Sequence, residues 1–522
     1  MTITALKEQL SALLGDENVL NDNENCILYA QDVYTKDLPA MLVIRPKSTS
    51  LLSQAVKLIT EAGSAIIPRG GGMSYTKGFV PSEKESVIVD TSSLNDVIEI
   101  NEKDMYVRVQ SGCSWKKLYE TLKNTGLRTP FWGTLSGSFA TIGGGLSQNG
   151  IFWGSGQHGF AVDSVLSLEV VLANGDVINT GAGATINGTP FMRHYGPDLT
   201  GIFCTDNAAL GIKTTVTLRL IAQVKENDGV SFCFETFAQQ SAVMSEVARQ
   251  GLASETCGFD PYLQAQRLKR ESLVSDVKSL VGVMKSAGGI GKALKQGAKI
   301  ALAGRNFVEE NSWSVHFIVE DRTEAGVKER LDSIREIAAK YQGNEVENTI
   351  PKVLRANPFG PVNNMIGPNG ERWAPVHTLV PHSKAEHAYQ KSSEIFSNHQ
   401  VAISKFNIGI GYLLATVSSN VFVLEPVFFW PDELNELHHH AIDSQHIKRV
   451  TKFTASPEAR AAVQAIREDL ILAYKDLGGV HMQIGKTYLF EQGINENNFN
   501  LLKNIKALVD PTNRMNPTAL GF

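Results

Sequence analysis

Cysteine is scarce in this chain, and the spacing of the cysteines suggests no pair among them. The 522 residues include only five, at wide intervals and without a Cys-x-x-Cys pair. An odd number at such spacing does not build a disulfide framework, and the missing pair excludes zinc ribbons and dithiol redox motifs. Cysteine usage is therefore typical of a reducing compartment, and we expect a cytoplasmic protein. The five are Cys26, Cys113, Cys204, Cys233 and Cys257.

Long apolar runs and a basic excess are also missing. The most apolar stretch, 408–430, is broken by Asn420, Glu425 and Pro426, so it falls short of the ~20 residues that a membrane-spanning helix needs. Charged residues from Lys7 onward precede any apolar core at the N-terminus, so we expect no secretory signal. The 49 Lys and Arg against 54 Asp and Glu give a net charge of −5. We therefore predict no nucleic-acid partner and no membrane span.

Two common nucleotide-binding motifs are absent. No G-x-x-x-x-G-K-[ST] sequence occurs, which excludes a P-loop. The nearest approach to G-x-G-x-x-G, at 181–186, lacks the third glycine and runs into Pro190 instead of a helix. The sequence therefore excludes a Rossmann dinucleotide-binding fold.

Glycine, by contrast, is abundant, and it gathers in two segments. The first reads Pro-Arg-Gly-Gly-Gly-Met-Ser-Tyr at 68–75, and the second reads Ala-Thr-Ile-Gly-Gly-Gly-Leu-Ser-Gln-Asn-Gly at 140–150. Consecutive glycines leave backbone N–H groups uncovered, so that these groups can converge on an anion. A plain flexible turn would explain one such segment alone. Because there are two, each beside strand-like sequence, we predict that they close on both phosphates of a dinucleotide.

The hydrophobic periodicity of the chain predicts an α+β fold. A strand–helix–strand unit spans 41–67 and leads directly into the first glycine segment. Residues 129–160 are expected to form a long ligand-binding loop. Residues 166–180 predict a hairpin that turns at an Asn-Gly pair. After about residue 225, strand-like and helical segments alternate, which predicts a second α+β domain. We interpret the Gly-, Ala- and Lys-rich stretch at 282–304 as a mobile excursion.

In combination these motifs resemble the FAD-binding domain of the vanillyl-alcohol oxidase / p-cresol methylhydroxylase (PCMH-type) superfamily. The hairpin at 168–176 fits this pattern, and the segment 196–214 resembles the end of the FAD domain in D-lactate dehydrogenases and glycolate oxidase subunits. Asp510-Pro511 with Asn516-Pro517 resembles the C-terminal return that covers the flavin. The resemblance implies a two-subdomain FAD-binding domain at 1–225, an α+β cap (substrate) domain at 226–480, and a C-terminal segment at 481–522 returning to the FAD.

The resemblance also implies which residues contact the FAD. Met73 stands where a common variant of the family has a His that binds the cofactor covalently, and no His or Tyr stands just before the strand at 373–376, where another linkage occurs. We therefore expect non-covalent FAD. The expected FAD-binding residues are Arg69, Gly70, Gly71, Gly72, Met73, Ser74, Thr141, Gly143, Gly144, Asn149 and Asn516.

Four residues are candidates for the chemistry at the flavin. His481, in a Gly-Gly-Val-His segment, resembles the Gly-Glu-His-Gly segment near the substrate of D-lactate dehydrogenases, although Val480 replaces the acidic residue. A neutral His suits proton transfer near pH 7. Arg372 can clamp a carboxylate in a bidentate manner. His377 and His158 are further candidates, each with a purely structural role as the alternative.

We predict no metal site. His377 and His382 stand five residues apart and face opposite sides of a regular strand unless Pro381 bends it. The run His438-His439-His440 cannot face one ion from regular structure, so we interpret it as a solvated helix start.

Together these features predict an FAD-dependent oxidoreductase that transfers a hydride from a CH–OH group to the flavin. The favoured function is a D-lactate or D-2-hydroxy-acid dehydrogenase. The alternative is an aryl-alcohol or 4-alkylphenol oxidase, because the strand at 373–376 resembles that of those enzymes. A non-catalytic flavin-binding redox subunit is a third reading. The implied partners are a small alcohol or hydroxy-acid substrate and an electron acceptor. The acceptor can be a quinone, a cytochrome or O2. A homodimer is possible as well.

Overall fold

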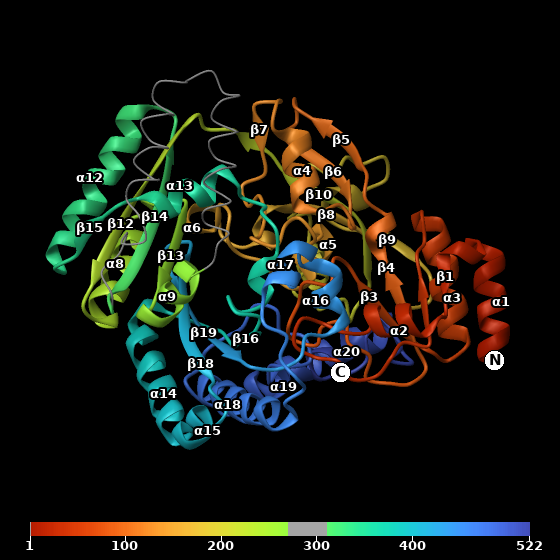
Figure 1. Ribbon diagram of the computed structural model, residues 1–522. Coiled ribbons are helices and arrows are strands. Elements are labelled where there is room, and N and C mark those ends of the chain that lie inside the picture. Colours follow the sequence, from red (N-terminus) through yellow and green to blue (C-terminus); the bar gives the residue numbers. More distant parts are fainter. Residues whose placement is uncertain (1, 270–310) are drawn as a thin grey trace.

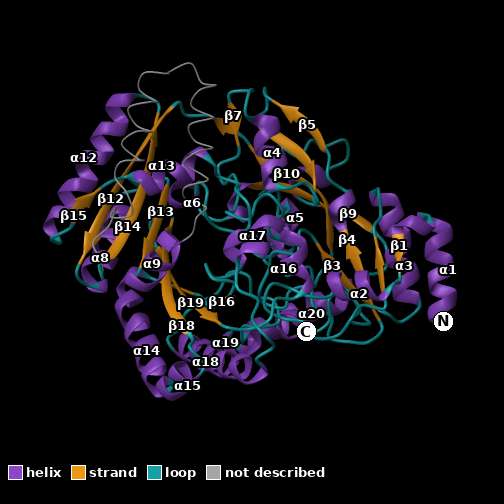
Figure 2. Ribbon diagram, in the orientation of Figure 1, coloured by secondary structure: helices purple, strands orange, loops and turns teal. Residues whose placement is uncertain are grey.

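The computed structural model describes residues 2–269 and 311–522. The excursion expected at 282–304 lies outside the described residues. Figure 1 places two small sheets on the right, built from the first half of the chain, and one large sheet on the left. The blue C-terminal segment passes beneath both. Helices and strands mix throughout, which confirms the α+β class (Figure 2).

The first sheet is a parallel core with one antiparallel edge strand. Its order is β1-β2-β4-β3, with β2, β4 and β3 parallel. Helix α3 (Thr49–Glu61) is the crossover, capped by the Ser48 hydroxyl, which accepts the Leu51 N–H at 3.2 Å. Its buried stripe of Leu, Ala, Val and Ile side chains packs into the same core as this sheet. The other elements are α1 (Ile3–Leu14), α2 (Asn23–Tyr29), β1 (Val19–Leu20), β2 (Leu42–Ile44), β3 (Ala65–Arg69) and β4 (Ser86–Asp90).

The second sheet is five-stranded and antiparallel, in the order β5-β6-β10-β8-β9. The hairpin predicted at 166–180 is β8 and β9, where Gly175 adopts φ +87° and the Asp176 N–H donates to the Asn174 side chain at 2.9 Å. A side chain at Gly175 would be strained, so the Asn-Gly pair fixes this turn. The strands are β5 (Val97–Asn101), β6 (Tyr106–Gln110), β8 (Val165–Val171), β9 (Val177–Asn179) and β10 (Ile212–Arg219); beside them lie α4 (Trp115–Leu122), α7 (Leu199–Ile202) and the pair β7 (Leu127–Arg128) and β11 (Ile221–Ala222).

The segment 129–160 is not the structureless loop that we expected. It contains two short helices, α5 (Ile142–Ser147) and α6 (Ser155–His158). The Thr141 hydroxyl accepts the Gly144 N–H at 3.3 Å and caps α5, while Ile142 and Leu146 are fully buried against the second sheet. The glycine run masked this helix, because glycine carries no helical periodicity of its own.

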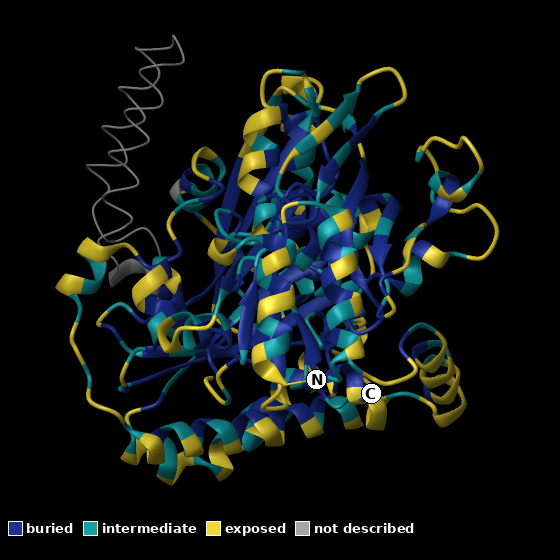
Figure 3. Cartoon of the chain, turned by 90° about the vertical axis from the view of Figure 1, so that its right-hand side faces the viewer, coloured by how far each residue is buried: buried dark blue, intermediate teal, exposed yellow. Residues whose placement is uncertain are grey.

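The third sheet has eight strands and is antiparallel throughout, with the path β15-β12-β14-β13-β18-β19-β16 and β17 also pairing with β19. Helices cover it on the left of Figure 1. Figure 3 shows buried strands in dark blue inside the molecule and exposed yellow residues on the outer faces of helices. The strands are β12 (Glu226–Phe234), β13 (Glu255–Phe259), β14 (Trp313–Asp321), β15 (Asn344–Val346), β16 (Arg372–Pro375), β17 (Thr378–Val380), β18 (Gly409–Val417) and β19 (Val421–Trp430). The helices are α8 (Phe237–Arg249), α9 (Pro261–Lys269), α12 (Glu324–Lys340), α13 (Thr349–Ala356), α14 (Ala385–Asn398), α15 (Gln400–Lys405), α16 (Glu436–Ala441), α17 (Ser444–Arg449) and α18 (Pro457–Asp476).

A buried charge cluster joins the β7–β11 pair to the third sheet. Arg128, at the end of β7, contacts Glu320 of β14 at 2.5 Å. Glu320 also pairs with Arg355 of α13. Glu255 of β13 accepts the Gly154 N–H at 2.8 Å. Both carboxylates are almost fully buried, so the pairing is what makes their burial tolerable.

The chain ends against its own first sheet. After α19 (Phe490–Gly493) and α20 (Glu496–Val509), the Ile66 N–H of β3 donates to the Arg514 carbonyl at 2.7 Å, and the Asn516 N–H donates to the Ile66 carbonyl at 2.8 Å. The expected C-terminal return therefore lies beside β3. Within the described ranges, no helix combines the length and apolarity that crossing a bilayer requires. We propose 225/226 and 480/481 as domain limits, since β12 begins the third sheet at Glu226.

Candidate functional site

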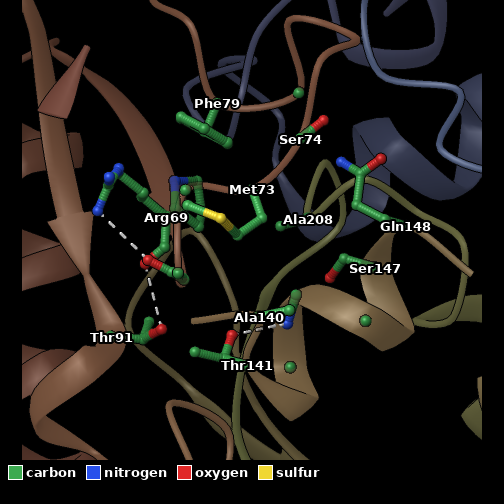
Figure 4. A pocket seen from close by; sticks show the side chains of 18 of the residues that line it. Arg69, Met73, Ser74, Phe79, Thr91, Ala140, Thr141, Ser147, Gln148 and Ala208 are labelled. Carbon is green, nitrogen blue, oxygen red and sulfur yellow. Dashed lines mark hydrogen bonds between the residues drawn. The ribbon is translucent and has the colours of Figure 1, made fainter. Parts of the chain in front are cut away.

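The two glycine segments face each other across one cavity of about 890 Å³ (Figure 4). Figure 4 shows Arg69, Met73 and Phe79 on one wall and Ala140, Thr141, Ser147 and Gln148 on the other. Nine of the expected FAD-binding residues line this cavity, so folding brings together segments about 70 positions apart in the sequence. They are Arg69, Gly70, Gly71, Gly72, Met73, Ser74, Thr141, Gly143 and Gly144.

The glycines allow the two segments to touch. A Cβ atom on Gly70 would lie 2.2 Å from the Thr141 hydroxyl oxygen, and one on Gly71 would lie 1.8 Å from the Phe139 carbonyl oxygen. Neither distance is compatible with a side chain. Gly72 adopts φ +74°, a conformation that L-residues rarely take. The triple glycine is therefore required by backbone approach and not only by flexibility.

The first segment offers donors that the protein itself does not use. Among the described residues, no acceptor receives a hydrogen bond from the backbone N–H groups of Gly71, Gly72, Met73 or Ser74. Ser111 also lines the cavity. Its buried hydroxyl has no hydrogen-bond partner among the described residues. Converging amides with nothing to bind form an anion site. This donor set fits the diphosphate of a dinucleotide.

Cations stand at the edges of the cavity and are held by their neighbours. The Arg69 guanidinium lies 4.6 Å above the Tyr29 ring and 5.4 Å from the Phe79 ring, and burial lowers its pKa. Lys213 donates to Asp206 at 2.7 Å and to Ser147 at 2.8 Å. These contacts pre-position both cations, so a bound anion would not have to order them.

Two expected FAD-binding residues are beside the cavity and not in its lining. The Asn516 amide donates to the Gly78 carbonyl at 2.8 Å and to the Asn207 carbonyl at 2.7 Å, and both of those residues line the cavity. Asn149 adopts φ +55° between two lining residues. Asn516 therefore braces the wall from behind.

A second cavity of about 1280 Å³ adjoins the first beneath the large sheet. Met73, Thr134, Ser136 and Gln483 line both, so the two cavities are neighbours. Apolar and aromatic side chains from β16, β18 and β19 dominate the second cavity, and no Arg, Lys or His belongs to its lining as far as the structure describes the chain. Its aromatic and large aliphatic members are Met73, Tyr75, Leu135, Ile151, Phe152, Leu263, Met365, Trp373, Leu413, Leu414, Phe429 and Met482.

One carboxylate lies within this apolar cavity. Glu425 of β19 is 5 % exposed and accepts a hydrogen bond from the Tyr75 hydroxyl at 3.3 Å. Burial and the Glu425 charge raise the pKa of Tyr75 well above its usual value, so the hydroxyl keeps its proton. Our sequence reasoning treated Glu425 only as an interruption of an apolar run. That interruption was the available signal, because an acidic residue in a buried strand needs a partner or a function.

His481 and His377 lie together, but behind the cavities. His481 Nδ1 donates to the His377 carbonyl at 2.8 Å, and its ring stacks on Tyr488 at 3.9 Å. Burial lowers the pKa of His481 to about 4 and that of His377 to about 3. Neither residue is in the described lining of either cavity. Their catalytic roles stay predictions.

Arg372 is committed to the protein backbone. Its guanidinium donates to the carbonyls of Tyr34 at 2.8 Å, Glu433 at 3.2 Å and Val33 at 3.3 Å. It is 4 % exposed and belongs to the described lining of neither cavity. The structure thus places the expected carboxylate clamp where it joins three segments of chain.

The remaining histidines also have structural surroundings. His158 ends α6 outside both described linings, and burial lowers its pKa to about 4. The interpretation of 438–440 as a solvated helix start is wrong for His438, which is fully buried. Its ring accepts the Asn435 N–H at 3.2 Å, which completes the cap of α16. Among the residues that the structure describes, no three His, Cys, Asp or Glu side chains gather as metal ligands would.

Comparison with known families defines the class of protein. Residues 40–181 match the model of the FAD binding domain, and they include the parallel strands β2, β3 and β4 of the first sheet and the two glycine segments. This part of the chain is therefore a PCMH-type FAD-binding domain, and FAD is its cofactor. The expected resemblance is confirmed.

Particular relatives resemble the chain in part. It is 28% identical over 256 residues to the glycolate oxidase subunit GlcD of Bacillus subtilis (strain 168), covering 49% of this chain and 53% of that protein. It is 27% identical over 345 residues to the mitochondrial D-lactate dehydrogenase [cytochrome] of Arabidopsis thaliana, covering 65% of this chain and 53% of that protein. The chain thus spans about half the length of these relatives.

Solved structures share the fold over nearly the whole chain. p-Cresol methylhydroxylase with substrate bound superposes with a TM-score of 0.74 at 17% identity, covering 99% of this chain and 96% of that one. The 4-ethylphenol oxidase of Gulosibacter chungangensis superposes with a TM-score of 0.73 at 18% identity, covering 99% and 97%. The two-subdomain FAD-binding fold with an α+β cap is therefore confirmed.

Proposed function

We propose that this protein is an FAD-dependent oxidoreductase that oxidises the CH–OH group of an apolar, aromatic alcohol. The observation that carries the proposal is a buried carboxylate, Glu425, in the described lining of a largely apolar cavity beside the first cavity. Apolar walls bind an aromatic substrate by burying its surface. The Glu425 carboxylate among them orients the hydroxyl that reacts.

Each group has a defined role in this reaction. FAD, when bound, supplies the acceptor for the hydride that leaves the alcohol carbon. Glu425 accepts the hydroxyl proton, so the alcohol becomes a carbonyl compound with one hydride and one proton removed. Tyr75 donates to Glu425 at 3.3 Å and holds the carboxylate in place. The apolar cavity walls exclude water from the reacting carbon.

The lining favours an aromatic alcohol over a 2-hydroxy acid. A carboxylate substrate needs a cation, and the described lining of the second cavity offers none. Glu425 would in addition repel it. The two phenol-oxidising neighbours, p-cresol methylhydroxylase and 4-ethylphenol oxidase, share the fold of the cap. We therefore propose aryl alcohols as the substrate class, ahead of D-lactate.

A D-2-hydroxy acid is the second candidate. It rests on sequence relatives that include glycolate oxidase and D-lactate dehydrogenases. Anaerobic mixing with vanillyl alcohol, 4-ethylphenol, D-lactate and D-2-hydroxyglutarate separates the two, because the true substrate class bleaches the flavin absorption near 450 nm, a wavelength typical of oxidised flavin. Bleaching by the hydroxy acids alone would overturn the aromatic proposal. Bleaching by none would support a non-catalytic flavin subunit.

Replacing Glu425 tests the proton acceptor. In Glu425→Gln the rate of flavin reduction by the substrate should fall about 10²–10⁴-fold, because general base catalysis typically contributes that factor. FAD content should be unchanged. Glu120→Gln, at an exposed position on α4, is the control and should reduce at the wild-type rate. An unchanged rate in Glu425→Gln would remove Glu425 from the mechanism.

We also propose that the FAD is bound without a covalent bond by the eleven residues expected from the sequence. Met73 lines both cavities at the position where a linking His occurs in relatives of this pattern. A thioether at this position cannot form that linkage. Acid precipitation measures the outcome: yellow flavin should stay in the supernatant, and colour in the pellet would contradict the proposal.

A further inference from the structure

Gln483 occupies the junction of the two cavities. It lines both, and so does Met73 of the first glycine segment, while Tyr75 of that segment lines the second cavity with it. The Gln483 backbone adopts φ +49°, which is uncommon for a residue other than glycine. The Gln483 N–H donates to the Gln148 carbonyl at 2.7 Å, so the second glycine segment fixes its backbone.

A buried histidine holds the preceding residue. His377 Nε2 donates to the Met482 carbonyl at 2.7 Å, while His377 Nδ1 accepts from the Tyr488 hydroxyl at 2.9 Å. The Tyr488 oxygen in turn accepts the His377 backbone N–H at 2.9 Å. These three bonds fix the tautomer of His377 with its proton on Nε2. The Met482 carbonyl is thereby clamped immediately before Gln483.

The clamp is insensitive to pH in the working range. Burial lowers the pKa of His377 to about 3, so its ring is neutral wherever the protein is folded and active. A fixed neutral imidazole positions a neighbour well and transfers protons poorly. The geometry of Gln483 is therefore defined from two sides, by His377 through Met482 and by Gln148 directly.

We propose that the Gln483 carboxamide hydrogen-bonds to the isoalloxazine ring of FAD at the junction of the cavities, and that His377 is the positioning residue that aims it there. This inference rests on the proposed function in placing the ring at that junction. It goes beyond it by assigning to Gln483 the tuning of the flavin, and to His377 and Tyr488 an indirect role in place of a catalytic one.

Redox titration of the purified holoprotein tests the assignment without any alcohol substrate. The flavin midpoint potential is measured during reduction by xanthine and xanthine oxidase with indicator dyes, together with the absorption spectrum and the FAD Kd. Gln483→Glu keeps the shape and places a negative charge at the junction, so the midpoint potential should fall. Gln483→Leu removes the hydrogen bond, so the FAD Kd should rise about five- to tenfold and the absorption bands should shift.

Paired variants distinguish the positioning of Gln483 by His377 from a general loss of protein stability. His377→Leu should reproduce the spectral shift of Gln483→Leu, whereas His377→Gln, whose amide can still donate to the Met482 carbonyl, should restore the wild-type spectrum. His439→Leu, at an exposed position, is the control and should change nothing. If Gln483→Leu does not fold, Gln483→Glu alone decides.

Two results would overturn the proposal. One is a Gln483→Glu protein that binds FAD with the wild-type potential and spectrum. The other is a His377→Gln protein as altered as His377→Leu. Failure of every alcohol to bleach the flavin would overturn the proposed function but would leave these redox measurements intact, so the two ideas fail separately.

Discussion

At the scale of single residues, a charged side chain is interpreted by what it contacts. An arginine beside a predicted substrate strand suggests a carboxylate clamp, and the guanidinium of Arg372 has the donors for it. In the structure its two terminal nitrogens donate to three backbone carbonyls, and burial lowers the pKa of Arg372. Arg372 therefore joins the N-terminal segment near Tyr34 to β16.

Replacing Arg372 should therefore cost stability and not substrate affinity. Arg372→Met leaves three buried carbonyls without a donor, so the free energy of unfolding should fall by about 2–4 kcal/mol. Urea denaturation measures this loss, and steady-state kinetics measures KM. Unchanged stability with a KM raised tenfold or more would instead restore the clamp hypothesis.

At the scale of elements, the glycine segments depend on contact between two loops. Gly71 lies against the Phe139 carbonyl, where a Cβ atom would be 1.8 Å away. A methyl group there forces the two segments apart and separates the amides that we assign to the diphosphate.

Gly71→Ala should accordingly yield a folded protein that has lost most of its FAD. The FAD-to-protein absorbance ratio measures this loss, and fluorescence titration with added FAD gives the affinity. Gly251→Ala is the matched control, because Gly251 also has special backbone geometry (φ +62°) but no neighbour within 4 Å of its Cβ position. Gly251→Ala should lose some stability yet stay yellow; a yellow Gly71→Ala would contradict the loop-contact argument.

Elements with local signals could be predicted from the sequence. The hairpin at Asn174-Gly175 and the helix capped by Ser48 follow from turn and cap chemistry within a few residues. The glycine segments were recognisable for the same reason. The pairing of Tyr75 with Glu425 was not, because 350 positions separate them and only the tertiary fold brings β19 over the first glycine segment.

At the scale of the whole molecule, buried charges connect the FAD-binding domain to the cap. Glu255 and Glu320 share the Arg355 guanidinium, and Arg128 reaches Glu320 from the other side. Burial, followed by repulsion from Glu320, raises the pKa of Glu255 from 4.5 to about 7. The contact between the FAD-binding domain and the cap therefore contains a carboxyl group that titrates near neutral pH.

This shift predicts how stability depends on pH. The folded protein holds a proton on Glu255 that the unfolded chain releases above about pH 4.5. The contribution is thus fully present below pH 4.5 and is lost as the pH rises through about 7. In Glu255→Gln this loss should disappear, a difference on the order of 1–3 kcal/mol between pH 5 and pH 8. Thermal melts of both proteins at the two pH values measure it; parallel curves would contradict the assignment.

The fold also ties the last residues to one of the earliest strands. β3 leads into the first glycine segment, yet its Ile66 bonds to Arg514 and Asn516, and the Asn516 amide braces Gly78 and Asn207 behind the cofactor. The ribosome must therefore extrude the chain past residue 516 before this wall can close. Nascent chains stalled before residue 514 should be unable to retain the flavin.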